Sequence, residues 1–501
     1  MFNSKNNVLN AITAILFTLV NGVLGIIVTR LVILHYGSDF NGLNSTANQI
    51  VNVLLIFEGG FTIASNVALF KPISENDYDK INGLLYLTRK KFRKISLLCL
   101  FFGFLVAFVY TYLINSNLQA ELVFCVIFMT VISTAFNLFY ATTYRVLLQS
   151  NQKEYIINII MCICIGTGHL ANVVIILNNG NAWLIRFTTM IFSIISSVAI
   201  GLYAKKIFKY LNLKHHSSQL NISGTKDVMI QKITGVIYNS VPIVFLSISP
   251  SAGTVLASVY AVYNNVLNMV KSLLRGVIDA PRHGLGLLIS KDDRKSVWDV
   301  FYQYEYITIV SIFIVIVTTY VMILPFISIY TSGVQDAEYY DFYIAFFMIL
   351  IAYFELIHIP SGHLMNMAGE FKIGKIFQNI ACIVLIILMP IGLFTLGVYG
   401  LLLAVALVSI LLAILEIGFV HCYYFKNKLI KFLYLLVSFT IFGILLCIIE
   451  KMIFTNINSI ISFIGYGVVI FSINSLFAFL LSYFLYKKQL NKIIQLLNNL
   501  L

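Results

Sequence analysis

The sequence predicts an all-α polytopic membrane protein with about fourteen transmembrane helices, and two observations of composition point to it first. Of 501 residues, 60% are hydrophobic and only 11% are charged, whereas a soluble domain carries roughly 25% charged residues. The mean hydropathy is +0.92. The third observation is that apolar runs long enough to cross a hydrocarbon core of about 30 Å recur along the whole chain.

The predicted spans cover most of the chain, at 8–34, 44–70, 95–114, 122–148, 155–177, 183–203, 233–250, 254–287, 302–328, 342–368, 375–392, 399–424, 431–450 and 459–486. The first run is too long for the apolar segment of a signal peptide, and no small-residue cleavage pattern follows it. We therefore expect the first span to remain in the mature protein.

The basic residues predict the orientation of the spans. With the N-terminus on the cytoplasmic side, the cytoplasmic segments hold 26 of the 33 Lys and Arg residues, and the external segments hold only Lys451. Positive residues concentrate on the cytoplasmic side of membrane proteins. We expect both termini in the cytoplasm and the protein in a bacterial cell membrane. The topology accounts for the net charge of +13, so nucleic acid is not expected as a partner.

The sequence offers little that would serve an enzyme, a cofactor or a metal. The seven cysteines form no CxxC pair and lie in or beside apolar runs, which disfavours zinc and a disulfide framework. The loops are too short for a soluble catalytic domain, and no Walker-A, HExxH or GxSxG motif occurs. We expect a non-enzyme without cofactors.

An internal repeat divides the chain. The stretch NQIVNVLLIFEGG (48–60) aligns with NNVLNMVKSLLRG (264–276) and matches Asn48, Asn52 and Gly60 with residues 216 positions later. At a nearby offset, LLQSNQKEY resembles LMNMAGEFK. Six spans separate the copies, so both cross the membrane in the same direction. This predicts two pseudo-symmetric six-helix lobes with a pathway between them, at 1–215 and 216–428, followed by two C-terminal helices and a cytoplasmic tail at 429–501.

The eighth span carries a polar stripe. The second span is expected to run without a break to Lys71, so its counterpart should reach about Leu287, which places Lys271 about 24 Å from that end. Helical spacing puts six polar residues on one face: Asn264, Asn268, Lys271, Arg275, Asp279 and Arg282. The stripe predicts a cationic cavity that binds substrate, or alternatively a structural network in which Asp279 pairs with Arg275 and Arg282.

The N-terminal lobe carries a similar polar face with fewer charged residues. Its predicted substrate-binding residues on the second span are Asn48, Asn52 and Glu58, with Glu58 at the edge of the face. Arg145 lies near the inner end of the fourth span, where it either snorkels or faces the pathway. His169 shares one face of the fifth span with Asn158, Cys162 and Asn172, and Arg186 is expected to be an interfacial anchor.

The tenth span contains FELIHIPSGH, in which Glu355 and His358 are three residues apart and so share a helix face. A single ExxH is half of a di-iron site, so no metal is expected. Because histidine titrates near neutrality, the pair is a candidate for ion coupling, together with Asp279 and His169. Helix packing is the alternative.

TRLVILHYGSDFNGLNSTANQIVNVLLIFEGGFTIASNVALFKPI (29–73) resembles the opening of bacterial polysaccharide-biosynthesis flippases, the Wzx-like branch of the MOP transporter superfamily, as do YTSGVQDAEYYDF (330–342) and NMAGEFKIGK (366–375). The resemblance implies two six-helix lobes around an alternating-access cavity. It also implies transport of undecaprenyl-pyrophosphate-linked oligosaccharides to the outer leaflet, and it carries over Arg30 and Glu58 as site residues. The partners implied are this lipid-linked saccharide, membrane lipids, a coupling H⁺ or Na⁺, and the polysaccharide polymerase machinery.

The sequence therefore predicts a flippase for capsule, exopolysaccharide or O-antigen-like units. Basic residues suit a pyrophosphate because Lys and Arg bind phosphate oxygens. A MATE-type drug or cation antiporter is the first alternative, although an acidic cavity would suit it better. A lipid II flippase is the second. A membrane glycosyltransferase or polymerase would need a larger external loop than 329–341.

Overall fold

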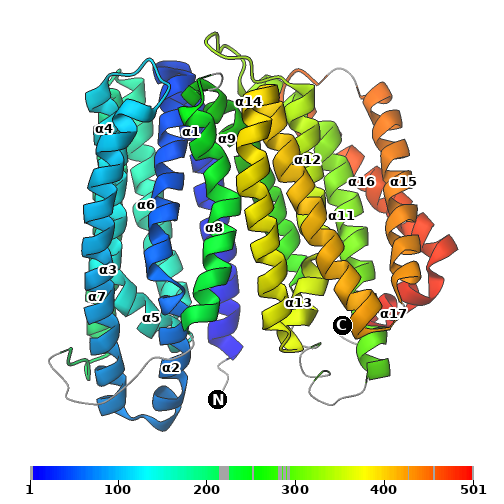
Figure 1. Cartoon of the computed structure of the whole chain (residues 1–501), viewed down its shortest axis with the longest axis horizontal. Helices are drawn as coiled ribbons and strands as arrows, with labels where there is room; N and C mark the ends of the chain where they lie inside the picture. Colours follow the sequence, from blue (N-terminus) through cyan, green and yellow to red (C-terminus); the bar gives the residue numbers. More distant parts are fainter. Residues whose placement is uncertain are drawn as a thin grey trace. The chain divides into compact units, whose positions relative to one another are not determined.

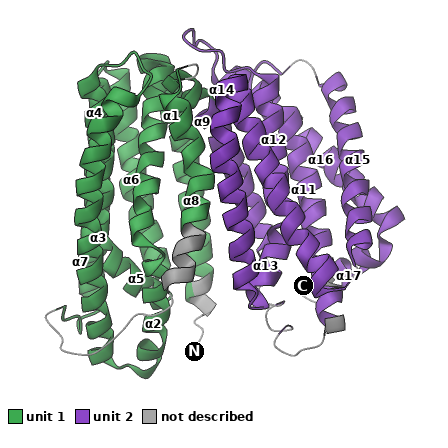
Figure 2. Cartoon of the chain, in the orientation of Figure 1, with its two compact units in different colours: residues 1–259 green, residues 260–501 purple. Residues whose placement is uncertain are grey.

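The computed structural model describes residues 4–213, 225–250, 253–279, 285, 289, 294–426, 428–454 and 457–498. All regular structure in this part of the chain is helical (Figure 1). Within the described ranges, ten helices are long and apolar enough to cross a membrane, so the chain is a multi-pass membrane protein. It forms two compact units, residues 1–259 and 260–501 (Figure 2).

The described residues of the N-terminal unit form eight α-helices, two short irregular helices and the start of a ninth α-helix. They are α1 (Ser4–Leu54), η1 (Leu55–Glu58), α2 (Phe61–Glu75), α3 (Tyr78–Leu113), α4 (Ala120–Phe136), η2 (Asn137–Ala141), α5 (Thr142–Ser150), α6 (Glu154–Leu177), α7 (Ala182–Ile207), α8 (Thr225–Ile248) and α9 (Gly253–Ile278). Most of α9 belongs to the C-terminal unit. The other helices of that unit are α11 (Arg294–Tyr330), α12 (Phe342–Ile357), α13 (Ile359–Met367), α14 (Phe371–Gly418), η3 (Phe419–Tyr424), α15 (Leu429–Ile453), α16 (Ile460–Leu485) and α17 (Lys487–Asn498).

Several helices begin at a side chain that satisfies the free backbone N–H groups of a first turn. The Asp77 carboxylate accepts a hydrogen bond from Lys80 N at the start of α3. Asp341 accepts from the N–H groups of Tyr343 and Ile344 at the start of α12. These caps end the connecting segments and fix where the apolar helices start.

Two long helices each contain a reversal at a glycine. Gly37 in α1 has φ 85°, a conformation that favours glycine. Asn10, before Gly37, donates to Gln152 O at 3.2 Å, and Asn66, well after Gly37, donates to Gln149 Oε1 at 3.2 Å. Both ends of the segment therefore meet the same turn between α5 and α6, so the chain returns after Gly37.

The reversal in α14 occurs at Gly397, with φ 61°. Gly392 and Gly400 lie so close across it that a Cβ on either would overlap the backbone of the other. A continuous helix would separate these two residues by about 12 Å. Hence α1 holds the first predicted span and the start of the second, α14 holds the eleventh and most of the twelfth, and every predicted span falls mainly on helix.

The repeat is visible in backbone detail. Gly37 and Gly253, 216 residues apart, both have positive φ. The turns at 147–155 and 364–372 share a hydrogen-bond pattern: Lys153 N donates to Leu148 O, and Glu370 N donates to Met365 O. The helices before these turns end at residues 150 and 367, and those after them begin at 154 and 371. The two halves therefore fold alike at these positions. The three-part division at residues 215 and 428 follows the repeat and stays a prediction.

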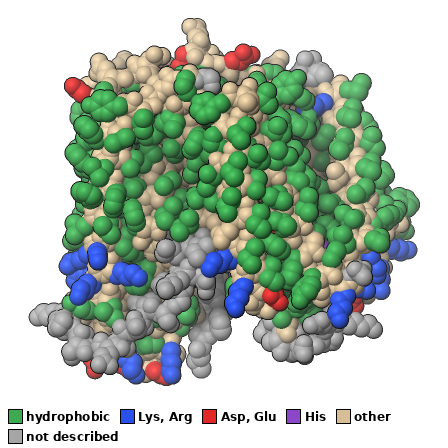
Figure 3. All heavy atoms as spheres, in the orientation of Figure 1, with side chains coloured by type: hydrophobic (Ala, Val, Ile, Leu, Met, Phe, Trp, Pro, Cys, Tyr) green, Lys and Arg blue, Asp and Glu red, His purple; other side chains and the backbone are tan. Residues whose placement is uncertain are grey.

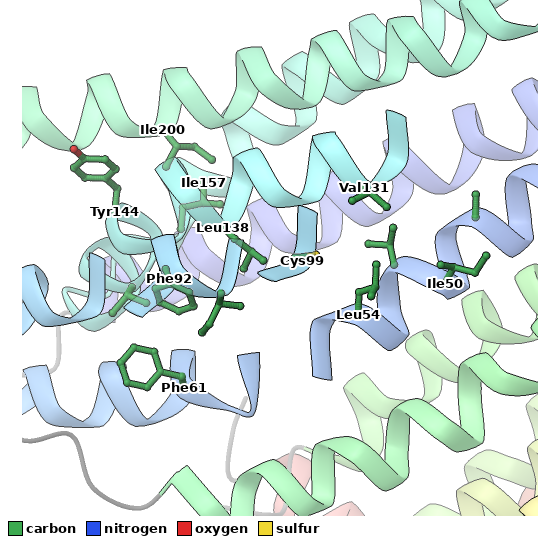
Figure 4. Packing of buried hydrophobic residues seen from close by; sticks show 14 of the residues in the cluster. Ile50, Leu54, Phe61, Phe92, Cys99, Val131, Leu138, Tyr144, Ile157 and Ile200 are labelled. Atoms are coloured by element: carbon green, nitrogen blue, oxygen red, sulfur yellow. The ribbon is translucent and has the colours of Figure 1, made fainter. Parts of the chain in front are cut away.

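The core of the N-terminal unit is formed by apolar side chains from α1 to α7 that point toward one another (Figure 4). Phe92 and Cys99 of α3 are fully buried, as is Val131 of α4. The rings of Phe61 and Phe92 meet edge to face at 5.4 Å, a favourable arrangement for aromatic pairs. This packing holds the helices that carry the unit's polar residues.

In the C-terminal unit, α11 packs against α12, α15 and α16. Its fully buried side chains include large aromatic residues such as Phe301, Tyr304 and Tyr306. The two C-terminal helices α15 and α16 thus pack on the rest of the unit through α11.

The second span is not continuous, which corrects a prediction. The helix α1 ends at Leu54, and both Gly59 and Gly60 have positive φ before α2 begins. An apolar run can conceal such a break because two adjacent glycines adopt left-handed backbone without steric strain.

The predicted end of the eighth span near Leu287 is therefore also wrong. The helix α9 ends at Ile278, two residues beyond Gly276, the repeat counterpart of Gly60. Lys271 lies seven residues before that end, about 10 Å rather than 24 Å. Lys271 therefore lies closer to the end of its helix than predicted, and residues 280–284 lie outside the described part.

On the face drawn in Figure 3, Lys and Arg side chains gather at one end of the helices in each unit. This end carries the turn between α2 and α3 in the N-terminal unit and the turn between α13 and α14 in the C-terminal unit. A one-sided distribution of positive charge is typical of a cytoplasmic surface. The cytoplasmic location of both termini stays a prediction.

Candidate functional site

The predicted site residues of the N-terminal unit meet in part around a polar cavity. Its volume is about 220 Å³, and residues of α1, α4, α6 and α7 line it. Asn48 and His169, both predicted, are among them. The other polar lining residues are Thr130, Ser133, Thr134, Asn172, Arg186, Thr189 and Ser193.

Arg186 is the charged residue of this cavity, which corrects its prediction as an interfacial anchor. Its side chain on α7 is buried, with 9% exposure. Its Nε donates to Thr130 Oγ1 at 2.7 Å, and its Nη2 donates to Asn48 Oδ1 at 2.5 Å. Sequence position suggested the membrane surface because Arg186 starts an apolar span, but packing against α1 and α4 decides its surroundings.

The face predicted for the fifth span contacts two neighbouring helices. Asn158 donates to Thr13 Oγ1 at 3.3 Å, and His169 Nε2 lies 3.1 Å from Asn21 Oδ1, both on α1. Asn172 donates to Thr189 of α7 at 3.2 Å. The helix α6 therefore presents its polar residues to α1 and α7.

Three other predicted residues of the N-terminal unit lie outside the lining of this cavity. The Asn52 side chain is exposed and donates to Gln49 Oε1 at 3.0 Å. Glu58 accepts hydrogen bonds from the backbone N–H and the hydroxyl of Thr62, and so helps to start α2 after the glycine break. Arg30 is half-buried in α1.

Arg145 on α5 is half-buried, and its Nη2 lies 3.3 Å from Met161 Sδ. It follows η2, the π-helical turn Asn137–Ala141. Its Nε is buried and has no hydrogen-bond partner among the described residues. A π-helical turn frequently marks a functional region, but Arg145 is not among the residues that line the polar cavity.

In the C-terminal unit, Lys271 forms a buried ion pair. Its Nζ on α9 donates to Glu355 Oε2 on α12 at 2.7 Å, and the two side chains are 11% and 14% exposed. The carboxylate compensates for the burial of the ammonium group. The prediction placed Lys271 and Glu355 in separate clusters, and the fold brings them together.

His358 also has a partner that the sequence did not indicate. Its Nδ1 lies 2.8 Å from Glu416 Oε2 on α14, and Glu416 is buried. Glu355 and His358 are close in sequence, yet each contacts a different helix: Glu355 pairs with Lys271 of α9 and His358 with Glu416 of α14. Their role in ion coupling stays a prediction. Glu416 lies near the end of a long apolar run, and no sequence pattern connects it with His358.

Asp279 faces a histidine instead of the arginines of its own helix. Its Oδ1 lies 3.7 Å from His363 Nε2, and His363 Nδ1 lies 2.8 Å from the Tyr304 hydroxyl. Among the described residues Asp279 forms no ion pair with Arg275, and Arg282 lies outside them. The described part of the stripe thus contacts α13, and through His363 it contacts α11, whereas the predicted Asp279–Arg282 pair stays a prediction.

The remaining members of the stripe differ in exposure. Asn264 is half-buried, whereas Asn268 and Arg275 are exposed. Lys271, between them, is buried. The stripe is thus not uniform: one cation pairs with a carboxylate inside the unit, and the next, Arg275, is exposed.

A separate pair, absent from the predictions, is wholly buried. His421 Nε2 on η3 lies 2.8 Å from Glu305 Oε1 on α11, with side-chain exposures of 0% and 1%. The rings of Trp298, Phe301 and Phe432 surround this histidine. Glu305 lies 23 residues after Arg282 and His421 lies 63 residues after His358, the nearest predicted site residues in sequence. Sequence spacing therefore gave no signal for this pair.

An apolar hollow of about 720 Å³ lies between α11, α12 and α15 of the C-terminal unit. Its lining includes Phe313, Phe346, Phe354 and Phe439. Phe354 directly precedes Glu355 in α12. The helix α12 therefore contributes both to the lining of this hollow and to the ion pair with Lys271.

No protein-family model matches the sequence, and no curated protein matches it. Solved structures match in fold. The lipid II flippase MurJ, in an inward closed conformation, is 16% identical, with 96% of this chain and 99% of that chain covered and a TM-score of 0.71. This chain has a MOP-type transporter fold. An inward-facing multidrug resistance MATE family transporter of the MOP superfamily is 12% identical, with 82% and 96% covered and a TM-score of 0.64.

A third structure, the MATE multidrug transporter DinF-BH, is 15% identical, with 86% of this chain and 97% of that chain covered and a TM-score of 0.58. These matches confirm the predicted fold class over nearly the full chain. At such identities they describe the fold, and function has to be argued from the sites.

Proposed function

We propose that this protein is a flippase that moves undecaprenyl-pyrophosphate-linked oligosaccharide units from the inner to the outer leaflet by alternating access, for capsule, exopolysaccharide or O-antigen-like synthesis. The observation that carries the proposal is the full-length fold similarity to a lipid II flippase. The motifs at 29–73, 330–342 and 366–375 support the polysaccharide branch. The proposal assigns no catalytic reaction to the chain.

The C-terminal unit suits a ligand with a charged head and an apolar tail. The exposed guanidinium of Arg275 is available to phosphate oxygens, which arginine binds in a bidentate manner. Lys271 would join it when a pyrophosphate replaces Glu355 as its partner. The apolar hollow beside Phe354 would accept part of the prenyl chain, because its lining is almost entirely hydrocarbon.

A drug or cation antiporter is less well supported by these residues. A cationic drug would be repelled by an exposed arginine, and the acidic side chains Glu355 and Glu416 are already paired with Lys271 and His358. Arg30, Asn52 and Glu58 remain proposed contacts of the saccharide or pyrophosphate. H⁺ or Na⁺ remains the proposed coupling ion, with Asp279, His169, Glu355 and His358 as candidate residues.

A lipid II flippase is a second candidate, favoured by the TM-score of 0.71 to such a protein. Its substrate shares the prenyl pyrophosphate, so the sites described above would serve both substrates. The two candidates differ in which lipid accumulates when the protein is removed.

The test is deletion of the coding sequence followed by analysis of lipid-linked saccharides. We expect undecaprenyl-linked repeat units to accumulate on the inner leaflet while surface polysaccharide is lost, and re-expression of the wild-type chain to restore both. Accumulation of lipid II would favour the second candidate. Unchanged surface polysaccharide and unchanged lipid-linked saccharides would contradict both.

A further inference from the structure

The two C-terminal membrane helices bury a carboxylate that has no basic partner. Glu450 of α15 is 2% exposed and forms no ion pair with any described residue, and its Oε1 has no hydrogen-bond partner among them. The next residue, Lys451, lies instead with its Nζ 3.7 Å from the centre of the Tyr320 ring. Cys447 and Phe454, one helical turn on either side of Glu450, pack against a hydrophobic cluster that includes side chains of α11 and α16. An ionised carboxylate in such surroundings needs a compensating charge.

Two neutral polar side chains meet near Glu450. Asn474 of α16 is fully buried, and its Nδ2 donates to Thr318 Oγ1 of α11 at 3.1 Å and to Glu450 Oε2 at 3.4 Å. The Asn474 Oδ1 is buried and has no hydrogen-bond partner among the described residues. The Thr318 hydroxyl donates its own proton to Ile314 O at 2.7 Å, so its oxygen keeps lone pairs for other contacts. Side chains of three helices thus bring carboxylate, amide and hydroxyl oxygens together.

We propose that Glu450, Asn474 and Thr318 bind one Na⁺ ion between α11, α15 and α16. A half-turn of the Asn474 amide exchanges Nδ2 for Oδ1, which then faces the other two side chains at the same separations of 3.1 and 3.4 Å. A Ca²⁺ ion takes oxygen ligands at about 2.3–2.6 Å, which sets neighbouring oxygens of an octahedral shell about 3.3–3.7 Å apart. Na⁺ has nearly the same ionic radius, so the oxygen spacing suits it.

The charge and the donor set both favour Na⁺ over other ions. One monovalent cation neutralises the single carboxylate, whereas a divalent cation would leave a positive charge in apolar surroundings. Oxygen ligands without a thiolate or an imidazole suit hard cations and disfavour zinc or copper. K⁺ is larger and needs a wider spacing of ligand oxygens than this one. A proton would also neutralise Glu450, and binding measurements separate that case because a protonated Glu450 binds no Na⁺.

The inference goes beyond the proposed function, because the site lies apart from the candidate coupling residues Asp279, His169, Glu355 and His358. A bound ion would join side chains of α11, α15 and α16, and so hold the two C-terminal helices on the rest of their unit. It does not depend on which lipid the chain transports. Na⁺ binding and lipid flipping are measured separately, so either claim can fail while the other stands.

The test is equilibrium binding of radioactive Na⁺ to the purified full-length chain in detergent, with choline as the replacement cation. We expect saturable binding by the wild-type chain. Glu450→Gln should bind one Na⁺ fewer per chain, because glutamine keeps the shape of the side chain but loses its charge. Any Na⁺ bound elsewhere should remain. Thr318→Val should weaken this site by about threefold or more, since one ligand oxygen is lost.

Thr319→Val is the matched control for Thr318→Val. Thr319 is the next residue of α11, and its hydroxyl makes the equivalent bond within the helix, to Val315 O at 2.7 Å. It has no hydrogen bond to Asn474 among the described residues. Its removal should change the Na⁺ affinity by less than about twofold.

Thermal unfolding at constant ionic strength gives an independent readout. A ligand that binds only the folded chain raises its Tm, so added Na⁺ should raise the Tm of wild type and of Thr319→Val more than that of Glu450→Gln. The proposal is overturned if folded wild type binds no Na⁺, or binds K⁺ in its place. It is equally overturned if Glu450→Gln binds as many Na⁺ ions as wild type, or if the two threonine variants lose equal affinity.

Discussion

Arg186 in the N-terminal unit and Lys271 in the C-terminal unit are both buried basic residues on polar helix faces, with 9% and 8% exposure. Lys271 reaches a carboxylate on a neighbouring helix at 2.7 Å, whereas Arg186 reaches only neutral oxygens. The C-terminal unit repeats this arrangement with Glu416–His358 and Glu305–His421. The C-terminal unit thus gives these buried basic side chains carboxylate partners, whereas Arg186 in the N-terminal unit has none among the described residues.

The largest expected effect concerns the fully buried pair of the C-terminal unit. His421→Leu leaves the Glu305 carboxyl without its partner, and breaking a buried pair costs about 3–5 kcal/mol. Thermal unfolding in detergent should show a large drop in Tm. Cys422→Leu, at the exposed neighbouring position, is the control and should unfold close to wild type. Equal melting of the two variants would show that the pair does not stabilise the unit.

The second effect concerns Lys271, whose pair is slightly exposed and so contributes less. Lys271→Met should lower the free energy of unfolding by about 2 kcal/mol because it leaves the Glu355 carboxylate without its ion-pair partner. The double variant Lys271→Met/Glu355→Leu should recover more than half of this loss. Denaturant unfolding of the single and double variants measures it, and a double variant less stable than Lys271→Met would contradict the pairing.

The third prediction is a small effect on stability in the N-terminal unit. Arg186→Gln should change the free energy of unfolding by less than about 1 kcal/mol, because no carboxylate loses its partner and glutamine still donates hydrogen bonds. The same unfolding measurement applies. A loss as large as that of Lys271→Met would mean that Arg186 has a structural partner, and the contrast between the units would fail.

These contrasts separate what the sequence predicts from what it does not. Helix positions follow from apolar runs, and the 216-residue repeat marks equivalent backbone turns at Gly37 and Gly253, because local conformation depends on nearby residues. The break at Gly59 and Gly60 was not predicted, because it lies inside an apolar run. The partners of Arg186, Lys271 and His358 come from other helices, and helical spacing gives a residue's face but not which helix packs against it.

The smallest effect on stability is expected at Arg275, whose side chain is exposed. Arg275→Gln should change the free energy of unfolding by no more than about 0.5 kcal/mol, while it lowers transport because the guanidinium is a proposed pyrophosphate contact. Unfolding and transport have to be measured on the same preparation. A transport rate equal to wild type would remove Arg275 from the mechanism.

The most direct measurement of the proposed function is flipping of an undecaprenyl-pyrophosphate-linked oligosaccharide in vesicles reconstituted with the purified chain. We predict that wild-type protein moves the lipid to the opposite leaflet much faster than protein-free vesicles do. The folded double variant Lys271→Ala/Arg275→Ala should not exceed the protein-free rate. Wild-type flipping no faster than protein-free vesicles, or full activity in the double variant, would contradict the account.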